Sequence, residues 1–374
     1  MSTIANKLAR EELVDMVPYQ SARRLYATGS DSASAQSKIW LNANEAPGTG
    51  HYNIESSSIN RYPDFQPDNL INAYCAYSGL TPANILATRG ADEGIELIIR
   101  TFCKAYQDSI LICPPTYGMY AISAENHGAN IVRVPLIDNQ LDTENMEAQV
   151  GKVKVVFLCS PGNPTGNLLT TESIKAALEL FGDTAIVVVD EAYIEFSPEN
   201  TKASWLKDYP QLVVLRTLSK AFALAGLRCG FTLANPDIIT MLSKVIAPYP
   251  ISAPVADIAS EALTTSGLEK MSTRVKETVT LRAQLSDWLK SQKWCVNVFE
   301  SDANFILFQT TNTKTKNFIF DHLKQQDILI RDQSSQLQLD NCLRISIGNE
   351  QELSLLKQTI INAFSQATSE TKND

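Results

Sequence analysis

The sequence predicts an α/β protein in which a mostly parallel sheet lies between helices and a smaller α+β unit follows it. From residue 68 onward, short apolar segments alternate with amphipathic ones, which is the pattern of a parallel sheet covered by helices. The segments Val153–Cys159 and Ala185–Val189 are almost continuously apolar, as expected for strands buried on both faces. The chain has 374 residues, of which 44% are hydrophobic, and this is enough for a large core.

Composition and charge exclude several classes of function. The net charge is −9 and the pI is near 5.0, which argues against a nucleic-acid-binding surface. The apolar segments are too short to span a membrane and the charged N-terminus has no signal-peptide pattern, so we expect a cytoplasmic protein. The seven cysteines form no Cys-x-x-Cys pair and the three histidines have no metal-ligand spacing, so we expect reduced thiols and no metal.

The first 38 residues are expected to form an arm, with a short helix followed by irregular chain that includes Val17–Arg24. Ile39–Glu45 should begin with a brief strand and lead into a turn rich in proline and glycine. Asp68–Tyr77 is apolar at helical spacing.

A glycine turn follows the next strand. Ile85–Arg100 has the pattern of strand, turn and helix, in which Gly90 allows a tight turn and the amides of Ala91 and Asp92 open the helix. Unpaired amides at a helix N-terminus bind anions. The alternative is a plain connection in which Asp92 caps the helix.

Two further strands end in rigid turns. Ser109–Gly118 presents Tyr117, whose ring could stack on a flat heterocycle or simply cover the core. Ser160–Gly166 contains two prolines and two glycines and displays Asn163 after a buried strand. Ligands bind outside the carboxyl ends of strands in open α/β sheets, so Asn163 could donate to a ligand oxygen; alternatively it bonds its own backbone.

Asp190 comes directly after the buried strand Ala185–Val189. A buried carboxylate is unstable unless it meets a cation or hydrogen-bond donors, and a protonated ring nitrogen would meet that need. Tyr193, three residues on, could place its hydroxyl near the same ring. The alternatives for Asp190 are a helix cap or a metal ligand, although the adjacent Glu191 should point elsewhere.

A lysine follows the strand that contains Val213–Leu215. Ser219 and Lys220 stand where this strand ends, and Arg228 comes eight residues after the lysine. An apolar pocket lowers the pKa of a lysine, which then can attack an aldehyde as a neutral amine. A hydroxyl and a guanidinium on either side suit a phosphate. Taken alone, such a short motif also fits ordinary surface charges.

The C-terminal part is predicted to be a small α+β unit, reached through a strand at Phe231–Ala234, a helix at Asp237–Ile246 and long helices within residues 256–291. Its expected strands and helices, in chain order, are the strands Cys295–Phe299 and Asn304–Gln309, the helix Thr315–Gln326, the strands Ile328–Ile330 and Cys342–Ile347, and the helix Gln351–Gln366. We therefore expect an arm at 1–38, a large domain at 39–255 and a small domain at 256–374, with the arm packed near the small domain.

Two arginines of this unit, Arg331 and Arg344, lie in or at the ends of strands. Arg344 alternates with Leu343 and Ile345, so it could project from one face of a strand and bind a carboxylate through both nitrogens. The alternative is an ion pair on the surface.

Taken in this order, these features resemble the fold-type I aminotransferases that depend on pyridoxal 5'-phosphate (PLP). The resemblance covers nearly the whole chain. It is carried by Ser160-Pro-Gly-Asn-Pro-Thr-Gly, Asp190-Glu-Ala-Tyr and Ser219-Lys-Ala-Phe-Ala-Leu-Ala-Gly-Leu-Arg. More specific segments resemble the histidinol-phosphate aminotransferases: Pro18-Tyr-Gln-Ser-Ala-Arg-Arg, Leu41-Asn-Ala-Asn-Glu, Arg61-Tyr-Pro, Arg89-Gly-Ala-Asp-Glu-Gly-Ile-Glu-Leu, Pro114-Pro-Thr-Tyr-Gly-Met-Tyr, Ile330-Arg-Asp and Cys342-Leu-Arg-Ile. Two positions depart from the family pattern. Asn44-Glu-Ala-Pro stands where many members have Asn-Glu-Asn-Pro or Asn-Glu-Tyr-Pro, and Gly162 stands where an asparagine is common. Neither departure removes a group assigned to chemistry.

The resemblance implies a seven-stranded sheet, a homodimer with active sites at the subunit interface, and small-molecule substrates rather than nucleic acid or membrane. It implies transfer of the amino group of glutamate to imidazole acetol phosphate, which gives 2-oxoglutarate and histidinol phosphate in histidine biosynthesis. Lys220, Asp190 and Tyr193 are the implied catalytic residues. The implied cofactor-binding residues are Ala91, Asp92, Tyr117, Asn163, Asp190, Tyr193, Ser219, Lys220, Arg228 and, from the partner subunit, Tyr62. The implied substrate-binding residues are Tyr19, Arg23, Asn44, Asn163, Arg331 and Arg344.

Three other activities remain open on the sequence. Two are enzymatic: an aromatic-amino-acid aminotransferase and a threonine-phosphate decarboxylase, which resembles this family closely. The third is a PLP-binding regulatory module without catalysis. That module would be expected to carry a basic DNA-binding segment, which the acidic chain does not offer, and it would tolerate loss of Lys220.

Overall fold

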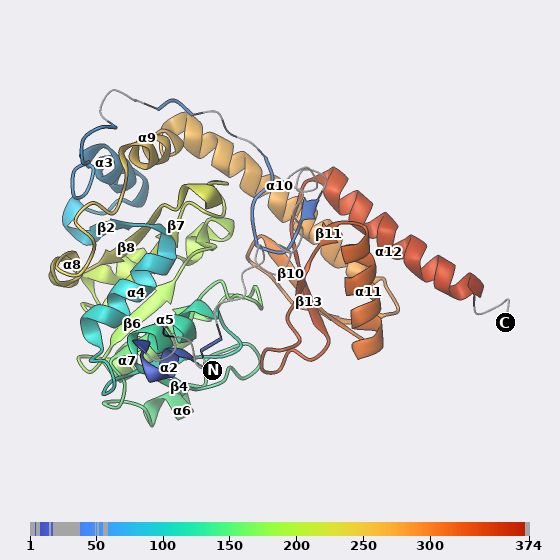
Figure 1. Cartoon of the computed structure of the whole chain (residues 1–374), viewed down its shortest axis with the longest axis horizontal. Helices are drawn as coiled ribbons and strands as arrows, with labels where there is room; N and C mark the ends of the chain where they lie inside the picture. The colour runs from blue at the N-terminus through green and yellow to red at the C-terminus, as the bar shows by residue number, and fades with distance from the viewer. Residues whose placement is uncertain are drawn as a thin grey trace.

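A computed structural model describes residues 4, 8–14, 16–17, 38–48, 50, 52–54 and 59–370, with side chains as far as residue 367. In this part of the chain a large and a small unit lie side by side, joined by the long helix α10 (Thr265–Lys290) (Figure 1). The predicted fold class is confirmed.

The large unit is built on a seven-stranded sheet with the strand order β2-β8-β7-β6-β5-β3-β4. Only β8 runs antiparallel to its neighbours, and the other pairs are parallel. The strands are β2 (Ile85–Thr88), β3 (Ser109–Ile112), β4 (Asn130–Arg133), β5 (Val155–Cys159), β6 (Ile186–Asp190), β7 (Leu212–Thr217) and β8 (Gly230–Ala234). The helices of this unit are α3 (Asp68–Ser78), α4 (Gly90–Phe102), α5 (Met119–His127), α6 (Thr143–Glu147), α7 (Thr171–Phe181), α8 (Pro236–Ser243) and α9 (Ala253–Ala262).

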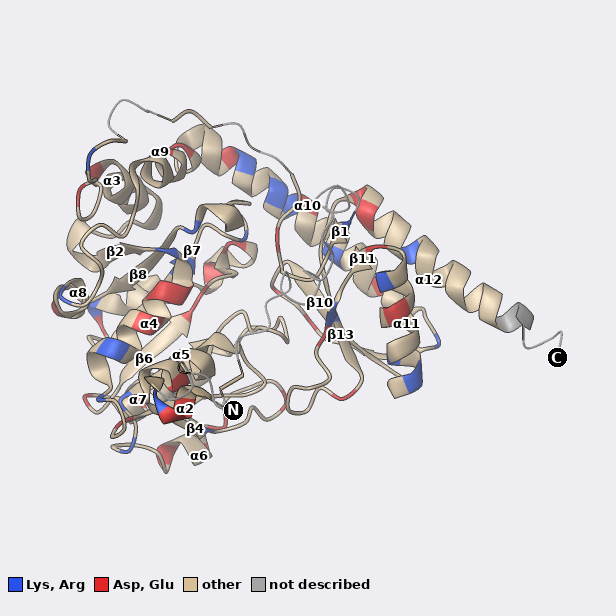
Figure 2. Ribbon diagram, viewed as in Figure 1, with Lys and Arg blue, Asp and Glu red and all other residues tan. Residues whose placement is uncertain are grey.

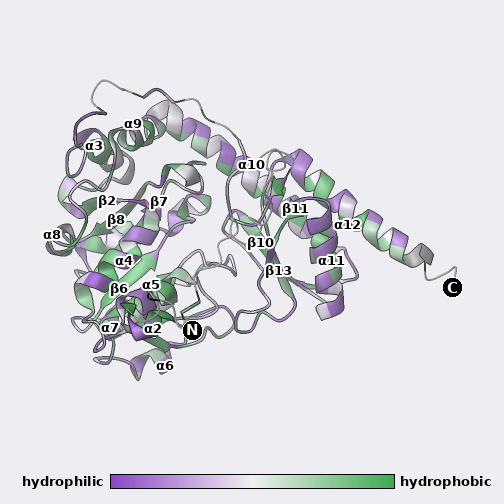
Figure 3. Cartoon of the chain, viewed as in Figure 1, coloured by the Kyte–Doolittle hydropathy of each residue, from purple (hydrophilic) through white to green (hydrophobic). Residues whose placement is uncertain are grey.

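Both faces of the sheet are covered, which explains the continuous apolar segments. In β5, Val155 and Phe157 pack into one core layer, whereas Val156 and Leu158 pack into the other. Successive strand residues point to opposite faces, so a strand between two layers needs apolar side chains at every position. In Figure 3, β6 and β8 are mainly hydrophobic, while α10 and α11 alternate between hydrophobic and hydrophilic residues.

The small unit contains a four-stranded antiparallel sheet with the order β12-β13-β10-β9. Its elements are β9 (Cys295–Val298), β10 (Phe305–Thr310), α11 (Thr313–Gln325), β11 (Ile328–Leu329), β12 (Arg331–Asp332), β13 (Cys342–Ser346) and α12 (Glu350–Glu370). The strand β1 (Ile39–Trp40) pairs with β11. The expected boundary assigns Ile39 and Trp40 to the large domain, but in the structure they pair with the small unit and Ile39 packs against its apolar core.

The N-terminal arm is only partly described. Arg10 donates a hydrogen bond to the hydroxyl of Tyr106 at 3.1 Å, and Glu12 accepts one from the same hydroxyl, so this part touches the large unit. Residues 18–37 lie outside the described residues, so the path of the arm near the small domain stays a prediction. Within the described ranges, no helix is long and apolar enough to cross a membrane.

Candidate active site

The predicted site residues meet at a cavity of about 650 Å³ between the carboxyl ends of the parallel strands and the small unit. Its walls come from both units, because the large unit contributes Lys220 and Asp190 whereas the small unit contributes Arg344. The other predicted site residues that line it are Asn44, Ala91, Asp92, Tyr117, Asn163, Tyr193, Ser219, Arg228 and Arg331.

Lys220 lies three residues beyond the end of β7, in the floor of the cavity. Its Nζ donates to the backbone oxygen of Ala43 at 3.3 Å and lies 5.5 Å from the centre of the Tyr193 ring. Burial and, to a smaller extent, the nearby charge of Arg344 lower the pKa of Lys220 to about 8. The amine is therefore closer to its neutral, nucleophilic form than a lysine in water.

Asp190 is the last residue of β6 and is only 3% exposed. One carboxylate oxygen, Oδ1, accepts from the amide of Ala192 at 3.1 Å, and the other, Oδ2, accepts from the hydroxyl of Tyr120 at 2.7 Å. Burial raises the pKa of Asp190 to about 6, although both hydrogen bonds act in the opposite direction. No group of three or more potential metal ligands occurs among the residues that the structure describes.

A chain of amides connects Tyr193 to Arg344. The oxygen of the Tyr193 hydroxyl accepts from Asn44 Nδ2 at 3.0 Å and from Asn163 Nδ2 at 3.2 Å. The other end of the Asn163 amide, Oδ1, accepts from Arg344 at 2.6 Å. Asn163 therefore lines the cavity while both ends of its amide form hydrogen bonds. Burial raises the pKa of Tyr193 above its usual value.

Arg344 is buried, whereas the alternative of a surface ion pair requires an exposed side chain. The side chain is part of β13 and the residue is 6% exposed. Its guanidinium donates to the backbone oxygen of Asn42 at 3.3 Å and lies 5.0 Å from the centre of the Phe305 ring. This contact with an aromatic face holds a flat cation in one orientation toward the cavity.

The glycine turn and Arg228 form one end of the cavity. Gly90 has a φ of 79°, and a Cβ atom there would come within 2.6 Å of the Arg228 guanidinium, so both backbone and space require glycine. Arg228 donates to Ser219 Oγ at 3.4 Å and to Asp92 Oδ2 at 3.1 Å. Asp92 also accepts from the Tyr117 hydroxyl at 3.0 Å, so its carboxylate orders two side chains.

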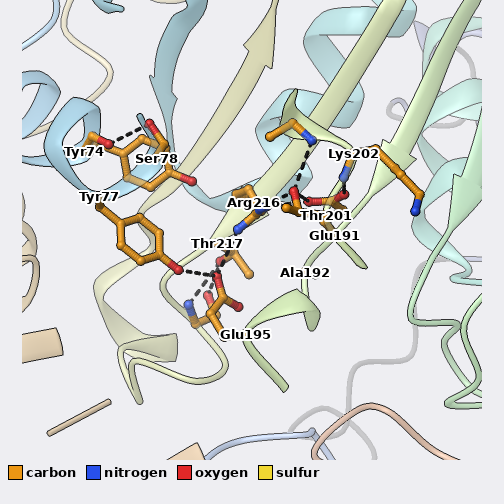
Figure 4. A network of polar contacts seen from close by, with 12 residues as sticks. Tyr74, Tyr77, Ser78, Glu191, Ala192, Glu195, Thr201, Lys202, Arg216 and Thr217 are labelled. Carbon is orange, nitrogen blue, oxygen red and sulfur yellow. Dashed lines mark hydrogen bonds and ion pairs between the residues drawn. The ribbon is translucent and has the colours of Figure 1, made fainter. Parts of the chain in front are cut away.

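Glu191 points away from the cavity, as expected, and belongs to a buried ionic cluster (Figure 4). Glu191 accepts from Arg216 Nε at 2.8 Å, and Glu195 accepts from the same guanidinium at 3.4 Å. Thr201 accepts from Arg216 and donates to Glu191, and Tyr77 donates to Glu195. The sequence analysis did not identify this cluster, because Arg216 and Glu191 stand 25 residues apart on neighbouring strand ends.

Among the predicted site residues that the structure describes, Tyr62 does not reach the cavity of its own chain. Tyr62 is 80% exposed, stacks on Tyr249 with 4.5 Å between ring centres, and does not line the cavity. Tyr19 and Arg23 lie outside the described residues. Tyr120 ends the segment Pro114–Tyr120 that carries part of the resemblance, but the sequence analysis gave it no role.

The chain is similar to known proteins over most of its length. The family described as aminotransferase class I and II matches residues 30–360. The chain is 63% identical over 365 residues to the histidinol-phosphate aminotransferase of Colwellia psychrerythraea, covering 95% of this chain and 99% of that relative. It is 52% identical over 352 residues to the protein of the same name from Yersinia enterocolitica, covering 94% and 91%. The crystal structure of histidinol-phosphate aminotransferase from Sinorhizobium meliloti in complex with pyridoxal-5'-phosphate has the same fold, with a TM-score of 0.79 and 23% identity over 95% of this chain and 97% of that chain.

Proposed function

This chain belongs to the aminotransferase class I and II family, and we propose that it performs PLP-dependent transamination between histidinol phosphate and 2-oxoglutarate in histidine biosynthesis. In the biosynthetic direction glutamate gives the amino group and imidazole acetol phosphate receives it. The observation that carries the proposal is that an amine, a buried carboxylate and a guanidinium, from Lys220, Asp190 and Arg344, line one cavity. The names of the similar proteins support the choice of substrate.

The chemistry of the side chains fits the ring of PLP. Asp190 would hold the proton of the ring nitrogen, because it is a buried carboxylate that faces the cavity. Tyr193 would donate to the phenolic oxygen, since its own oxygen already accepts two hydrogen bonds and its hydrogen remains for another acceptor. Asn163 lies beside Tyr193 and would donate a hydrogen bond to the same phenolic oxygen. Tyr117 would stack on the ring.

The phosphate would bind at the Gly90 end of the cavity. A guanidinium, a hydroxyl and unpaired helix amides are the groups that hold phosphates in proteins. These are supplied here by Arg228, Ser219, Ala91 and Asp92.

The mechanism follows from the positions of Lys220 and Arg344. When bound, PLP supplies an aldehyde that takes up the amino group and a ring that stabilises negative charge at the substrate α-carbon. Lys220 would hold the cofactor through its Nζ and, as a free amine, would move the α-proton of the substrate. Its pKa of about 8 leaves part of the amine neutral near neutral pH. The keto product of the first substrate would leave before the second substrate binds, so both would use the same side chains in turn.

Substrate selection would involve the small unit and the arm. Arg344 would bind the α-carboxylate of glutamate, and Asn44 and Asn163 would border the same position. Arg331 also lines the cavity and would contribute, with Tyr19 and Arg23 of the arm, to the phosphate end of histidinol phosphate.

We place the protein in the cytoplasm as a homodimer. Tyr62 would reach the PLP phosphate of the partner subunit, and its exposed ring, stacked on Tyr249, is presented on the surface of its own chain. The remaining partners would be small molecules, with neither nucleic acid nor membrane involved.

A half-reaction distinguishes the proposed function from its rivals. Purified protein with PLP is mixed with histidinol phosphate, phenylalanine or threonine phosphate, and the visible absorbance of the bound cofactor is followed. We expect rapid loss of this absorbance with histidinol phosphate and slow or no loss with the other two. Equal rates with phenylalanine would indicate an aromatic aminotransferase, and release of carbon dioxide from threonine phosphate without a keto acid would indicate a decarboxylase.

A further inference from the structure

A buried hydrogen bond that the proposed function leaves without a role joins Tyr120 to Asp190. Tyr120 is the second residue of α5, is fully buried, and donates from its hydroxyl to Asp190 Oδ2 at 2.7 Å. We propose that Tyr120 is a positioning residue, which orients the Asp190 carboxylate toward the ring nitrogen of PLP and keeps it ionised. This inference deepens the proposed function and rests on it for the identity of the ring.

The ring of Tyr120 is held on two sides, so its hydroxyl has little freedom to move. It stacks on Phe157 of β5 with 4.7 Å between ring centres, and it meets Tyr117 edge-on at 5.7 Å. Aromatic pairs of this kind favour defined geometries. Tyr120 therefore connects Tyr117, which would cover one face of the cofactor, with Asp190, which would hold its nitrogen.

The two hydrogen bonds to Asp190 come from different elements. Tyr120 approaches Oδ2 from α5, and the amide of Ala192 approaches Oδ1 from the loop after β6. Two donors on opposite oxygens fix the plane of a carboxylate as well as its position. The amide of Ala192 lies only two residues from Asp190 along the chain. Tyr120 is therefore the donor that connects Asp190 to a separate element, α5.

The negative charges around Asp190 favour its neutral form, and the hydrogen bond from Tyr120 opposes them. Asp92 on α4 and the adjacent Glu191 raise the pKa of Asp190, in the same direction as burial. Cys159 on β5 and Tyr193 also face it, and burial raises the pKa of both. Tyr120 and the amide of Ala192 are the groups that lower the pKa of Asp190. Removing the hydroxyl should therefore raise the pKa above about 6, toward neutral pH.

The experiment compares Tyr120→Phe with Tyr77→Phe in the full chain. Tyr77→Phe is a matched control, because it removes a half-buried hydroxyl that donates to another buried carboxylate, Glu195, away from the cavity. The dissociation constant of PLP is measured between about pH 5.5 and pH 8.5, a range that spans the ordinary titration of a buried carboxyl group. Thermal unfolding of the chain without PLP is measured over the same range.

We expect Tyr120→Phe to bind PLP about tenfold more weakly at the acid end, as for a pKa rise of about one unit, with the difference narrowing toward the alkaline end. Without PLP, its loss of melting temperature should grow as the pH rises, since an ionised Asp190 then lacks its donor. Tyr77→Phe should leave the pH dependence of PLP binding as in the parent.

Two results would overturn the inference. One is PLP binding by Tyr120→Phe that matches the parent at every pH, and the other is weakening by the same factor at every pH, which a packing defect alone would produce. A parent protein that takes up no PLP would overturn the proposed function and this inference together, whereas the unfolding measurement without PLP reports on the hydrogen bond by itself.

Discussion

The charged form of Lys220 is disfavoured in the folded chain because burial removes its hydration, and this lowers the stability of the protein. Its pKa falls from 10.5 in water to about 8 in the folded chain. Between these two values the unfolded chain binds more protons than the folded one, so stability rises with pH through that window. Below about pH 8 the destabilisation is present in full.

We therefore predict that Lys220→Met, without PLP, is more stable than the parent near pH 7 by about 1–2 kcal/mol, a value reduced because the residue is partly exposed. The gain should shrink by about pH 9.5, where the parent lysine has lost most of its charge. Urea unfolding at both pH values measures it. The same variant should lose transamination, and a variant that retained the parent rate would contradict the proposed role of Lys220.

At the scale of the element, the ends of β5, β6 and β7 determine most of the site. Asp190 and Lys220 could be predicted because each follows an apolar strand, and the carboxyl ends of parallel strands meet at one edge of the sheet. Arg344 was ambiguous, because alternation along a strand does not say which face is covered. The structure resolves it through the contact with Asn163, which lies 181 residues away.

Contacts that depend on packing between elements could not be predicted from the chain. Tyr120 lies inside a short helix whose sequence does not point to Asp190, and the two residues stand 70 positions apart. The strand pairing of Ile39 and Trp40 with β11 was likewise hidden, because both sides are short apolar segments that would suit many partners. Local spacing predicted the elements, and burial between them decided these contacts.

The buried cluster around Arg216 belongs to this scale, because it ties the ends of β6 and β7 together. The Arg216 side chain is 10% exposed, and those of Glu191 and Glu195 are 1% and 3% exposed. We predict that Arg216→Met destabilises the protein by about 3–5 kcal/mol, because it leaves two carboxylates buried without their cation. The loss should be greater at alkaline than at acid pH, since protonation neutralises the stranded carboxylates.

Urea unfolding of Arg216→Met and of Lys175→Met tests this prediction. Lys175 pairs with Glu179 at 3.8 Å on the surface, where both side chains are more than half exposed. Its loss should cost less than about 1 kcal/mol. Equal effects of the two substitutions would show that the buried cluster contributes no more than a surface ion pair.

For the whole molecule, the cavity depends on how the two units are held together. Arg274 of α10 donates to the backbone oxygen of Ala221, next to Lys220, at 3.0 Å. Arg282, two turns further along the helix, donates to the backbone oxygen of Ala303 in the small unit at 2.7 Å. Figure 2 shows basic residues at several turns of α10. This helix therefore contacts both sides of the cavity, which Arg344 and Asn163 join directly.

The proposed dimer can be tested by mixing two inactive proteins. If Tyr62 serves the active site of the partner subunit, each site combines Lys220 of one chain with Tyr62 of the other. A hybrid of Lys220→Ala and Tyr62→Ala chains then has one site with both defects and one site with none. Random exchange makes half of the dimers hybrids, so unfolding and refolding an equal mixture should restore about a quarter of the parent activity.

The outcome shows whether Tyr62 serves the active site of the partner subunit or that of its own subunit. In its own chain Tyr62 is exposed and lies outside the cavity. If Tyr62 acted within its own subunit, every site in the hybrid would carry one defect and mixing would restore no activity. Each variant refolded alone is the control, and size-exclusion chromatography shows whether dimers form. Recovery of activity by the mixture, but by neither variant alone, requires a site assembled from two chains. Such a site would also explain why the ring of Tyr62 is exposed and stacked on Tyr249.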